Sequence, residues 1–332
     1  METSFLFEQF KNKRIAIVGD VMLDAYLIGG VTRISPEAPV PIVGLSKKEN
    51  RLGGAANVAL NIVSLGAKAI ICSVVGNDTE GGELIDLFEK EGVSAEGIIQ
   101  SHSRKTTVKT RVIGNNQQLL RIDSEQTNNI SLTEENDLLV KLYALIDSGI
   151  DALIFEDYNK GVLTPSLIAG ILQRCQEKNI PTTVDPKKDN FFAYKGVTLF
   201  KPNLKELKEG LNLSFSIQDK VAFEDAVAQL EAKLENKNTF ITLSEHGVFI
   251  KSSIEKHYIP AHIRNIADVS GAGDTVISVA TLCLTVGLPL YQIAAYANLA
   301  GGLVCEKSGV VSIEKEQLAH EIKLLETEKI GE

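Results

Sequence analysis

The stretch from Asp268 to Asp274, DVSGAGD, constrains the fold of this chain most, because it runs directly into the apolar segment 275–284. Two glycines around an alanine leave the backbone almost bare where a helix begins, and the unpaired N–H groups there favour an anion. Asp274 adds a carboxylate to this anion pocket. The combination suits removal of a proton from a hydroxyl while the backbone of residues 271–273 stabilises a phosphoryl group in transit. The alternative interpretation is an ordinary acid in the first turn of a helix, preceded by a glycine turn.

The segment from Thr275 to Cys305 contains no charged residue, which superficially resembles a membrane span. Gly287 and Pro289 break it into two pieces that are short for a bilayer crossing, so the sequence predicts two buried helices and no membrane association. The N-terminal residues 1–14 lack the apolar core of a signal peptide. We therefore expect a cytoplasmic protein with buried, reduced thiols. These thiols are Cys72, Cys175, Cys283 and Cys305.

Apolar strand-like runs alternate with helical patterns along the chain, which indicates an α/β fold with a mostly parallel sheet. The first run, 14–21, ends in acidic residues, and ligands bind at the carboxyl ends of such strands. Asp20 and Asp24 fall there. No repeat or low-complexity linker divides the chain, so we expect a single domain over residues 1–332.

Two stretches interrupt the alternation and predict a small β lid. Residues 25–51 read as two strands around a proline-rich turn, and residues 105–123 read as a hairpin around Gly114-Asn115-Asn116. Apolar faces in these strands lead us to expect a homodimer formed through the lid.

Charge and motif patterns exclude several classes of function. The net charge is 34 − 43 = −9 and no basic run is present, which argues against a nucleic-acid partner. No GxxxxGK[ST] motif is present, which excludes a P-loop kinase. Val276 stands where a dinucleotide-binding GxGxxG motif needs its third glycine.

Two separated blocks resemble the signatures of the ribokinase-like (PfkB-type) carbohydrate kinases. The first is Gly53-Gly54-Ala55-Ala56-Asn57-Val58-Ala59, with Gly66 and Gly76 at the family's spacing, and the second is the block 268–274. The resemblance covers essentially the whole chain. It implies a three-layer sandwich with a central, mostly parallel sheet and a small β lid, and ATP-dependent phosphorylation of a sugar hydroxyl.

The resemblance also implies a role for each matching residue. Asp274 would be the base, and Gly271, Ala272 and Gly273 the anion hole. Sugar hydroxyls would be held by Asp20, Asp24, Gly54 and Asn57, which carry suitable donors and acceptors. For Asp20 the alternative is a cap at the end of a strand. Nucleotide binding would involve Asn203, Glu206, Thr242, Ser244, Glu245, Gly247 and Asn298.

The metal sites are implied in the same way. Asn203 and Glu206 match the family's NxxE motif, in which Glu206 orders Mg²⁺ through a water; taken alone, this pattern is only a helix N-cap signature. Asp268 and Ser270, with backbone groups near Lys307 and Gly309, resemble the K⁺ site that many members have and others lack.

Three narrower stretches, 33–41, 116–123 and 157–161, resemble one branch of this family, the heptose 7-phosphate kinases of ADP-heptose and lipopolysaccharide core synthesis. That branch phosphorylates C1 of D-glycero-β-D-manno-heptose 7-phosphate and is often fused to a nucleotidyltransferase; no HxGH-type motif of such a domain is present here. Candidates for holding this sugar phosphate are Arg33, Lys109, Arg111, Gln117, Lys160 and Lys187.

Two alternatives stay open at this point. In the first, the chain is a kinase of the same family whose acceptor is another sugar, such as ribose, fructose, a keto-deoxy acid or fructose 1-phosphate. In the second, the chain is a non-catalytic regulator that binds sugar or nucleotide on the same scaffold.

Overall fold

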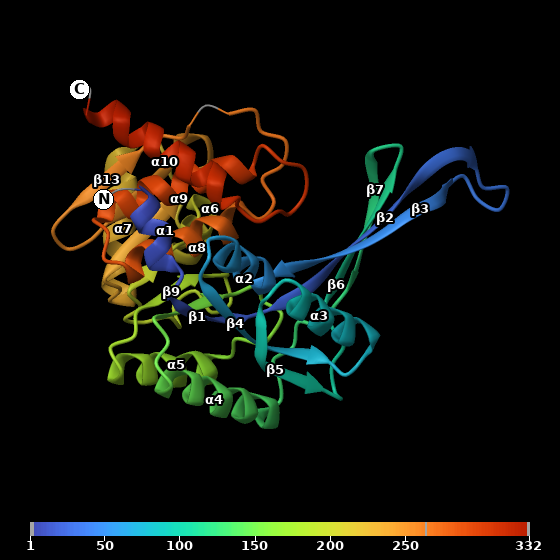
Figure 1. The fold of residues 1–332 in the computed structure, drawn as a ribbon, viewed down its shortest axis with the longest axis horizontal. Coiled ribbons are helices and arrows are strands. Elements are labelled where there is room, and N and C mark those ends of the chain that lie inside the picture. The colour runs from blue at the N-terminus through green and yellow to red at the C-terminus, as the bar shows by residue number, and fades with distance from the viewer. Residues whose placement is uncertain (1–2, 263, 331–332) are drawn as a thin grey trace.

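A computed structural model describes residues 3–262 and 264–330. Over these residues, a nine-stranded sheet has the strand order β13-β12-β11-β10-β9-β8-β1-β4-β5 (Figure 1). Its strands are parallel, except that β12 pairs antiparallel with both β11 and β13. The bounds are β1 (Arg14–Gly19), β4 (Lys68–Gly76), β5 (Ser94–Ser101), β8 (Ala152–Glu156), β9 (Thr182–Asp185), β10 (Leu199–Phe200), β11 (Asn238–Thr242), β12 (Val248–Lys251) and β13 (Lys256–Ile259).

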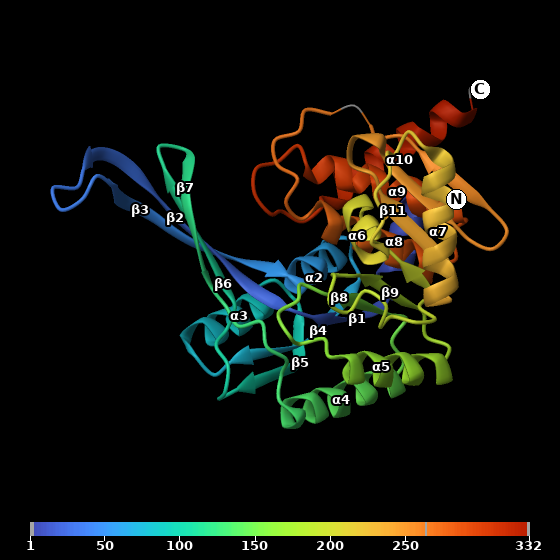
Figure 2. The same ribbon diagram turned by 180° about the vertical axis from the view of Figure 1, so that it is seen from behind.

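Helices cover both faces of this sheet, because its central strands are apolar on both sides. In β1, Ile15 and Ile17 pack into one core, whereas Ala16 and Val18 pack into the other. The first core is closed by α1 (Thr3–Phe10), α2 (Ala55–Ser64), α3 (Thr79–Lys90), α8 (Ala272–Thr285), α9 (Leu290–Val304) and α10 (Lys315–Ile330). The second is closed by α4 (Leu132–Asp147), α5 (Pro165–Glu177), α6 (Leu204–Leu211) and α7 (Lys220–Leu234). The predicted three-layer sandwich is confirmed (Figure 2).

The uncharged segment forms two buried helices, as the sequence predicts. Helix α8 ends at Thr285 and α9 begins at Leu290; Gly287 between them has a positive φ of 71°. Within the described ranges, no helix combines the length and the apolar character needed to cross a bilayer. The four cysteines are free and buried.

The lid is a separate four-stranded sheet with the order β3-β2-β6-β7. It consists of β2 (Val21–Ile34), β3 (Pro41–Gly54), β6 (Val108–Gly114) and β7 (Gln117–Ser124). The β2–β3 hairpin is 14 residues long on each side, or about 45 Å, and it extends far from the helical layers (Figure 1). The lid predicted at 25–51 and 105–123 is therefore present, with longer arms than the sequence indicated.

One boundary and three elements differ from the prediction. The first strand was expected to reach Val21, but β1 ends at Gly19, and β2 starts at Val21 after Asp20. Val21 and Leu23 are buried in the main core, so the base of the lid is as apolar as the strand before it. Strand β5 and helices α1 and α6 were not predicted. In β5, SAEGIIQS, the apolar residues do not alternate, because it is an edge strand that begins with partly exposed residues.

A capping box starts α4 and gives a stability prediction. The Glu134 carboxylate accepts hydrogen bonds from the Ser131 N–H (2.7 Å), the Ser131 hydroxyl (2.8 Å) and the Ser103 hydroxyl (3.1 Å). Burial alone would raise the pKa of Glu134, but these donors outweigh it and lower the pKa to about 2.

We expect Glu134→Gln to destabilise the chain by about 1–2 kcal/mol at pH 7, because ionised Glu134 is the better acceptor. A lowered folded pKa means that this stabilisation is present above the unfolded pKa near 4.5 and disappears as the pH falls towards 2. Urea unfolding of both chains at pH 7 and pH 3 measures the difference, with exposed Glu89→Gln as the control. An equal difference at the two pH values would contradict the assignment.

Candidate active site

The glycine turn opens α8 in the way that the sequence indicates. Gly271 is the N-cap residue and has φ 81°, a left-handed conformation that favours glycine. A Cβ at Gly271 would lie 2.9 Å from Asn57 Nδ2, and one at Gly273 would lie 3.2 Å from Asp185 Oδ2. The backbone of the turn therefore lies so close to neighbouring side chains that a side chain at Gly271 or Gly273 would crowd them. The first N–H groups of α8 lie at the same end of the helix.

Asp274 lies in the first turn of α8 and is held by two donors from other elements. Asn57 of α2 donates from Nδ2 to Oδ2 at 2.7 Å, and the Tyr158 hydroxyl donates to Oδ1 at 2.8 Å. Asp274 is only 5% exposed. Burial is the largest cause of its raised pKa, which the Asn57 hydrogen bond partly offsets. A fixed carboxylate with a raised pKa is suited to accept a proton.

Asp20 connects the first strand to the loop that carries Tyr158. Its carboxylate accepts backbone N–H groups of Tyr158 (2.9 Å), Lys160 (3.0 Å) and Val162 (3.1 Å). Gly54 passes so close that a Cβ there would lie 2.5 Å from the Asp20 carbonyl oxygen. The capping interpretation of Asp20 therefore has a structural basis, because its carboxylate organises the loop beside the base.

The charged candidates come from the base of the lid, which carries Lys109 and Arg111, and from the loops after β8 and β9, which carry Lys160 and Lys187. Arg111 donates to Asp24 at 2.6 Å and lies over the Tyr26 ring. The Lys109 and Lys187 ammonium groups lie 5.8 and 5.6 Å from the centre of the Tyr158 ring. Lys160 pairs with Glu125 at 2.7 Å. Lys109 and Lys187 therefore lie beside the Tyr158 ring, whose hydroxyl donates to Asp274.

Two candidates lie far out on the lid and do not join this group. Arg33 is exposed and lies nine residues beyond Asp24 along β2, or about 30 Å away. Gln117 is exposed, and it pairs with Gly114 next to the turn of the β6–β7 hairpin. Within one chain, the long lid keeps both side chains away from Asp274.

The nucleotide candidates gather on the other side of the glycine turn. A cavity of 440 Å³ is lined by Thr242, Ser244, Glu245, Gly247 and Asn298 together with Ala272 and Gly273. Apolar and small residues complete its wall, among them Val276, Gly301 and Gly302. Five of the seven nucleotide candidates therefore line one cavity at the start of α8, and Asn203 and Glu206 lie outside its lining.

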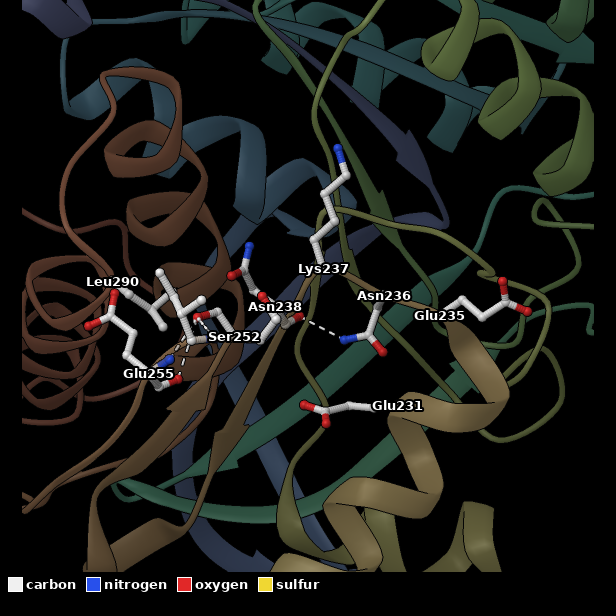
Figure 3. A pocket seen from close by; sticks show the side chains of 10 residues that line it. Glu231, Glu235, Asn236, Lys237, Asn238, Ser252, Glu255 and Leu290 are labelled. Carbon is white, nitrogen blue, oxygen red and sulfur yellow. Dashed lines mark hydrogen bonds between the residues drawn. The ribbon is translucent and has the colours of Figure 1, made fainter.

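A second cavity, of 620 Å³, lies at the opposite end of β11 (Figure 3). It is lined by the end of α7 and the β12–β13 turn, including Glu231, Asn238 and Ile254. Thr242 is at the carboxyl end of β11 and Asn238 is at its start. Because the catalytic candidates lie at the carboxyl ends of the strands, we assign the site to the smaller cavity.

Asn203 and Glu206 form the capping box of α6. Asn203 Oδ1 accepts the Glu206 N–H, and Glu206 Oε2 accepts the Asn203 N–H, each at 2.8 Å. Glu206 Oε1 also pairs with Lys187 at 2.6 Å. The N-cap interpretation is thus correct, and the same carboxylate is fixed next to a lysine of the site.

Asp268 joins the segment before α8 to the segment after α9. Its carboxylate accepts the N–H groups of Ser270 at 2.9 Å and Gly309 at 3.0 Å. Burial tends to raise its pKa, but these hydrogen bonds outweigh burial and the pKa is lowered. Asp268 and Ser270 therefore lie together beside the backbone at 309, as predicted.

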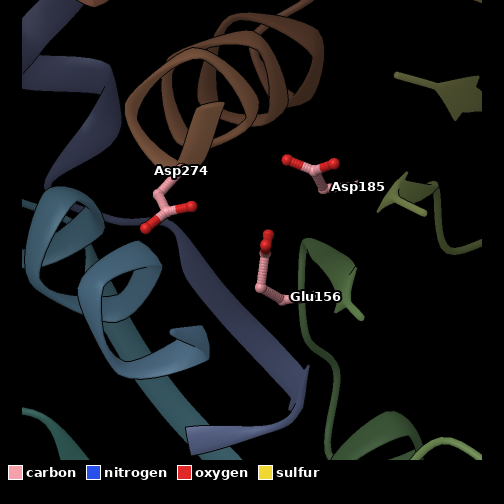
Figure 4. Close-up of side chains that lie close together, drawn as sticks. All are labelled: Glu156, Asp185 and Asp274. Carbon is pink, nitrogen blue, oxygen red and sulfur yellow. The ribbon is translucent and has the colours of Figure 1, made fainter. Parts of the chain in front are cut away.

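Sequence reasoning missed a cluster of buried charges at the centre of the site. Glu156, Asp185 and Asp274 each offer an oxygen within 4.8 Å of the others, and Figure 4 shows the three carboxylates pointing into one space. Lys201, also buried, pairs with Asp185 at 2.7 Å. Strand β8 ends at Glu156, its neighbour β9 ends at Asp185, and Lys201 directly follows the next strand, β10. Charged residues at the carboxyl ends of parallel strands were the sequence signal that could have revealed this cluster.

The pKa values within the cluster diverge. Burial, followed by repulsion from Asp185 and Asp274, raises the pKa of Glu156 well above its ordinary value. Burial would also raise the pKa of Asp185, but Lys187 and Lys201 outweigh it and lower this pKa. Both carboxylate oxygens of Glu156 are buried without a hydrogen-bond partner among the described residues. Hard oxygen donors that lack partners fit a divalent cation.

Comparison with known proteins identifies the family of this chain. The sequence model of the pfkB family carbohydrate kinases matches residues 12–317. The chain therefore belongs to the pfkB family of carbohydrate kinases. Membership of a kinase family implies ATP and a divalent metal ion for phosphoryl transfer.

Two relatives are each named bifunctional protein HldE. That of Citrifermentans bemidjiense is 37% identical over 322 residues, covering 97% of this chain and 66% of its own length. That of Trichlorobacter lovleyi is 38% identical over 320 residues, covering 96% and 65%. The chain thus spans about two thirds of the length of these relatives.

Solved structures share the fold. Phosphofructokinase-2 from Escherichia coli in complex with potassium superposes with a TM-score of 0.75 at 18% identity, covering 93% of this chain and 97% of that one. The ribokinase-like architecture inferred from the sequence is confirmed by this similarity.

Proposed function

We propose that the chain phosphorylates the C1 hydroxyl of D-glycero-β-D-manno-heptose 7-phosphate with ATP and Mg²⁺, giving the 1,7-bisphosphate. The observation that carries this proposal is the position of Asp274, a buried carboxylate between the nucleotide cavity and the cations beside Tyr158. The three heptose-kinase-like stretches and the two HldE relatives support the choice of sugar.

The proposed reaction follows from the groups that lie around Asp274. Asp274 accepts the proton of the sugar hydroxyl as that oxygen attacks the γ-phosphorus of ATP; the bond from this phosphorus to the β–γ bridging oxygen breaks, and ADP leaves. The N–H groups at 271–273 stabilise the negative charge on the phosphoryl group during transfer. Asn57 keeps Asp274 in place through Nδ2, while its Oδ1 is buried without a partner among the described residues and is available to a sugar hydroxyl. Mg²⁺ would neutralise the phosphates, with Glu206 acting through a water.

The 7-phosphate requires cations at the far end of the sugar. The candidates are Lys109 and Arg111 at the lid base, and Lys160 and Lys187 in the loops that follow β8 and β9. Lys109 and Lys187 lie beside the Tyr158 ring, and Arg111 pairs with Asp24. Arg111 already pairs with Asp24, so a phosphate there would gain an oriented guanidinium. Two charge-assisted contacts at about 1.5–3 kcal/mol each correspond to roughly 10²–10⁴-fold in affinity.

An ADP-release assay over a panel of acceptors tests the sugar. We expect kcat/KM for the heptose 7-phosphate to exceed that for ribose or fructose at least 100-fold, because those sugars leave the cations unpaired. The panel includes fructose 1-phosphate and a keto-deoxy acid, and Asp274→Asn protein sets the background from contaminating kinases. A preference for an unphosphorylated pentose would reject the heptose, and tight sugar binding without turnover would favour the regulator.

We also propose that the lid forms a homodimer. Leu120 (48% exposed) and Ile122 (54% exposed) lie on the opposite sheet face from Arg111, according to the strand register. An isolated sheet with such a face needs a covering layer, and a second copy supplies one. Light scattering should give a dimer for the wild-type chain and a monomer for Leu120→Lys/Ile122→Lys. A monomeric wild type at micromolar concentration would contradict this.

Two further assignments belong to the proposal. Asp268 and Ser270 would hold K⁺ together with backbone groups near Gly309, since the Asp268 carboxylate already joins these segments. A cytoplasmic location would match the four buried free thiols.

A further inference from the structure

We propose that Glu156, Asp185 and Asp274 form a divalent-cation site that the chain carries before any nucleotide or sugar is bound. This inference goes beyond the proposed function, because it does not depend on which sugar is phosphorylated. It also differs from the water-mediated position assigned to Glu206.

The three carboxylates come from separate elements and converge on one space. Glu156 is the last residue of β8, Asp185 is the last residue of the neighbouring β9, and Asp274 is in the first turn of α8. One oxygen of each lies within 4.8 Å of the others (Figure 4). The sheet and the helix therefore fix the spacing of these oxygens before any ion binds.

Glu156 is the member whose surroundings require a ligand. Asp274 has Asn57 and Tyr158 as donors, and Asp185 has Lys187 and Lys201. Glu156 is 0% exposed, and neither of its oxygens has a partner among the described residues. A buried carboxylate without a partner is costly, and it points into the cluster.

The charge balance of the cluster calls for a divalent cation. Four carboxylates meet here, those of Glu156, Asp185, Asp274 and Glu206. Two ammonium groups, those of Lys187 and Lys201, contact them. With all four carboxylates ionised, the surplus is 4 − 2 = 2 negative charges, which one divalent ion compensates.

The donor set selects the kind of ion. All three ligands are carboxylate oxygens, which prefer hard cations such as Mg²⁺ or Mn²⁺. Glu206 is tied into the capping box of α6, where its Oε2 accepts the Asn203 N–H, and its Oε1 accepts a hydrogen bond from Lys187. Glu156 has no such competition within the described part of the chain.

Mn²⁺ binding to the metal-free, full-length chain tests the site without nucleotide, sugar or turnover. Electron paramagnetic resonance of free Mn²⁺ should give one bound ion per wild-type chain, with a dissociation constant below about 1 mM. Glu156→Gln and Asp185→Asn should weaken binding at least tenfold. Exposed Glu91→Gln, which makes the same chemical change on the surface, should bind as the wild type does.

A melting experiment keeps the test informative if a variant folds poorly. Mn²⁺ should raise the Tm of the wild-type chain and leave that of Glu156→Gln unchanged, because only the former gains a bound ion. Absence of bound Mn²⁺ in the wild type at 1 mM (about the expected upper limit), or unchanged binding in Glu156→Gln, would overturn the proposal. Neither result would bear on the sugar preference, which the acceptor panel measures separately.

Discussion

Asp274→Asn should lower kcat by about 10³–10⁴-fold while sugar and nucleotide still bind with affinities close to those of the wild type. The amide keeps the shape of the side chain but cannot accept the sugar proton. Tyr158 and Asn57 both donate to Asp274, so one of these two hydrogen bonds would also be lost. Steady-state ADP release gives kcat and KM, and titration calorimetry gives the binding constants.

Asp86→Asn is the matched control, because Asp86 is exposed on α3, away from the glycine turn. It should have the activity of the wild-type chain. If Asp274→Asn instead retained turnover within tenfold of the wild type, Asp274 would not be the base, and the proton would have to go elsewhere.

Gly271→Ala should lower kcat by about 10²-fold, the second largest effect expected. Gly271 has φ 81°, and an added Cβ would lie 2.9 Å from Asn57 Nδ2 and 3.3 Å from Val310 Cγ1. Asn57 would have to move, and with it the hydrogen bond that holds Asp274. A displacement of about 1 Å at a catalytic group costs on the order of 10²-fold in rate.

Gly82→Ala provides the comparison for this substitution. Gly82 lies in α3, and a Cβ there would meet no heavy atom within 4 Å. That variant should keep full activity. The melting temperatures of both variants separate a local effect on the site from partial unfolding, and wild-type kcat in a folded Gly271→Ala chain would contradict the close packing described here.

Elements with strong local signals were predictable from the sequence. The apolar run 68–76 predicts a strand and the pattern from about residue 79 to residue 90 predicts a helix, and β4 and α3 have these bounds. Asp78 caps α3 by accepting the Gly81 N–H, and β4 is buried along nearly its whole length. Strand β5 was missed because its pairing with β4 is a long-range contact that leaves little pattern in its own residues.

Site residues that belong to local sequence motifs were predictable, whereas residues that only tertiary contacts bring into the site were not. The glycine turn and five residues that line the 440 Å³ cavity were recognised as candidates from local blocks. Tyr158, Glu156 and Lys201 were not, because their roles depend on which strands are neighbours. Arg33 shows the converse case, since a sequence block does not reveal that β2 places this residue about 30 Å from Asp24.

A crystal structure with heptose 7-phosphate and a non-hydrolysable ATP analogue tests the central claim most directly. We expect the C1 oxygen within about 3 Å of an Asp274 carboxylate oxygen, the γ-phosphate at the N–H groups of 271–273, and the 7-phosphate against the candidate lysines and Arg111. A sugar bound elsewhere, or a reacting hydroxyl more than about 5 Å from Asp274 with the nucleotide in its cavity, would contradict it.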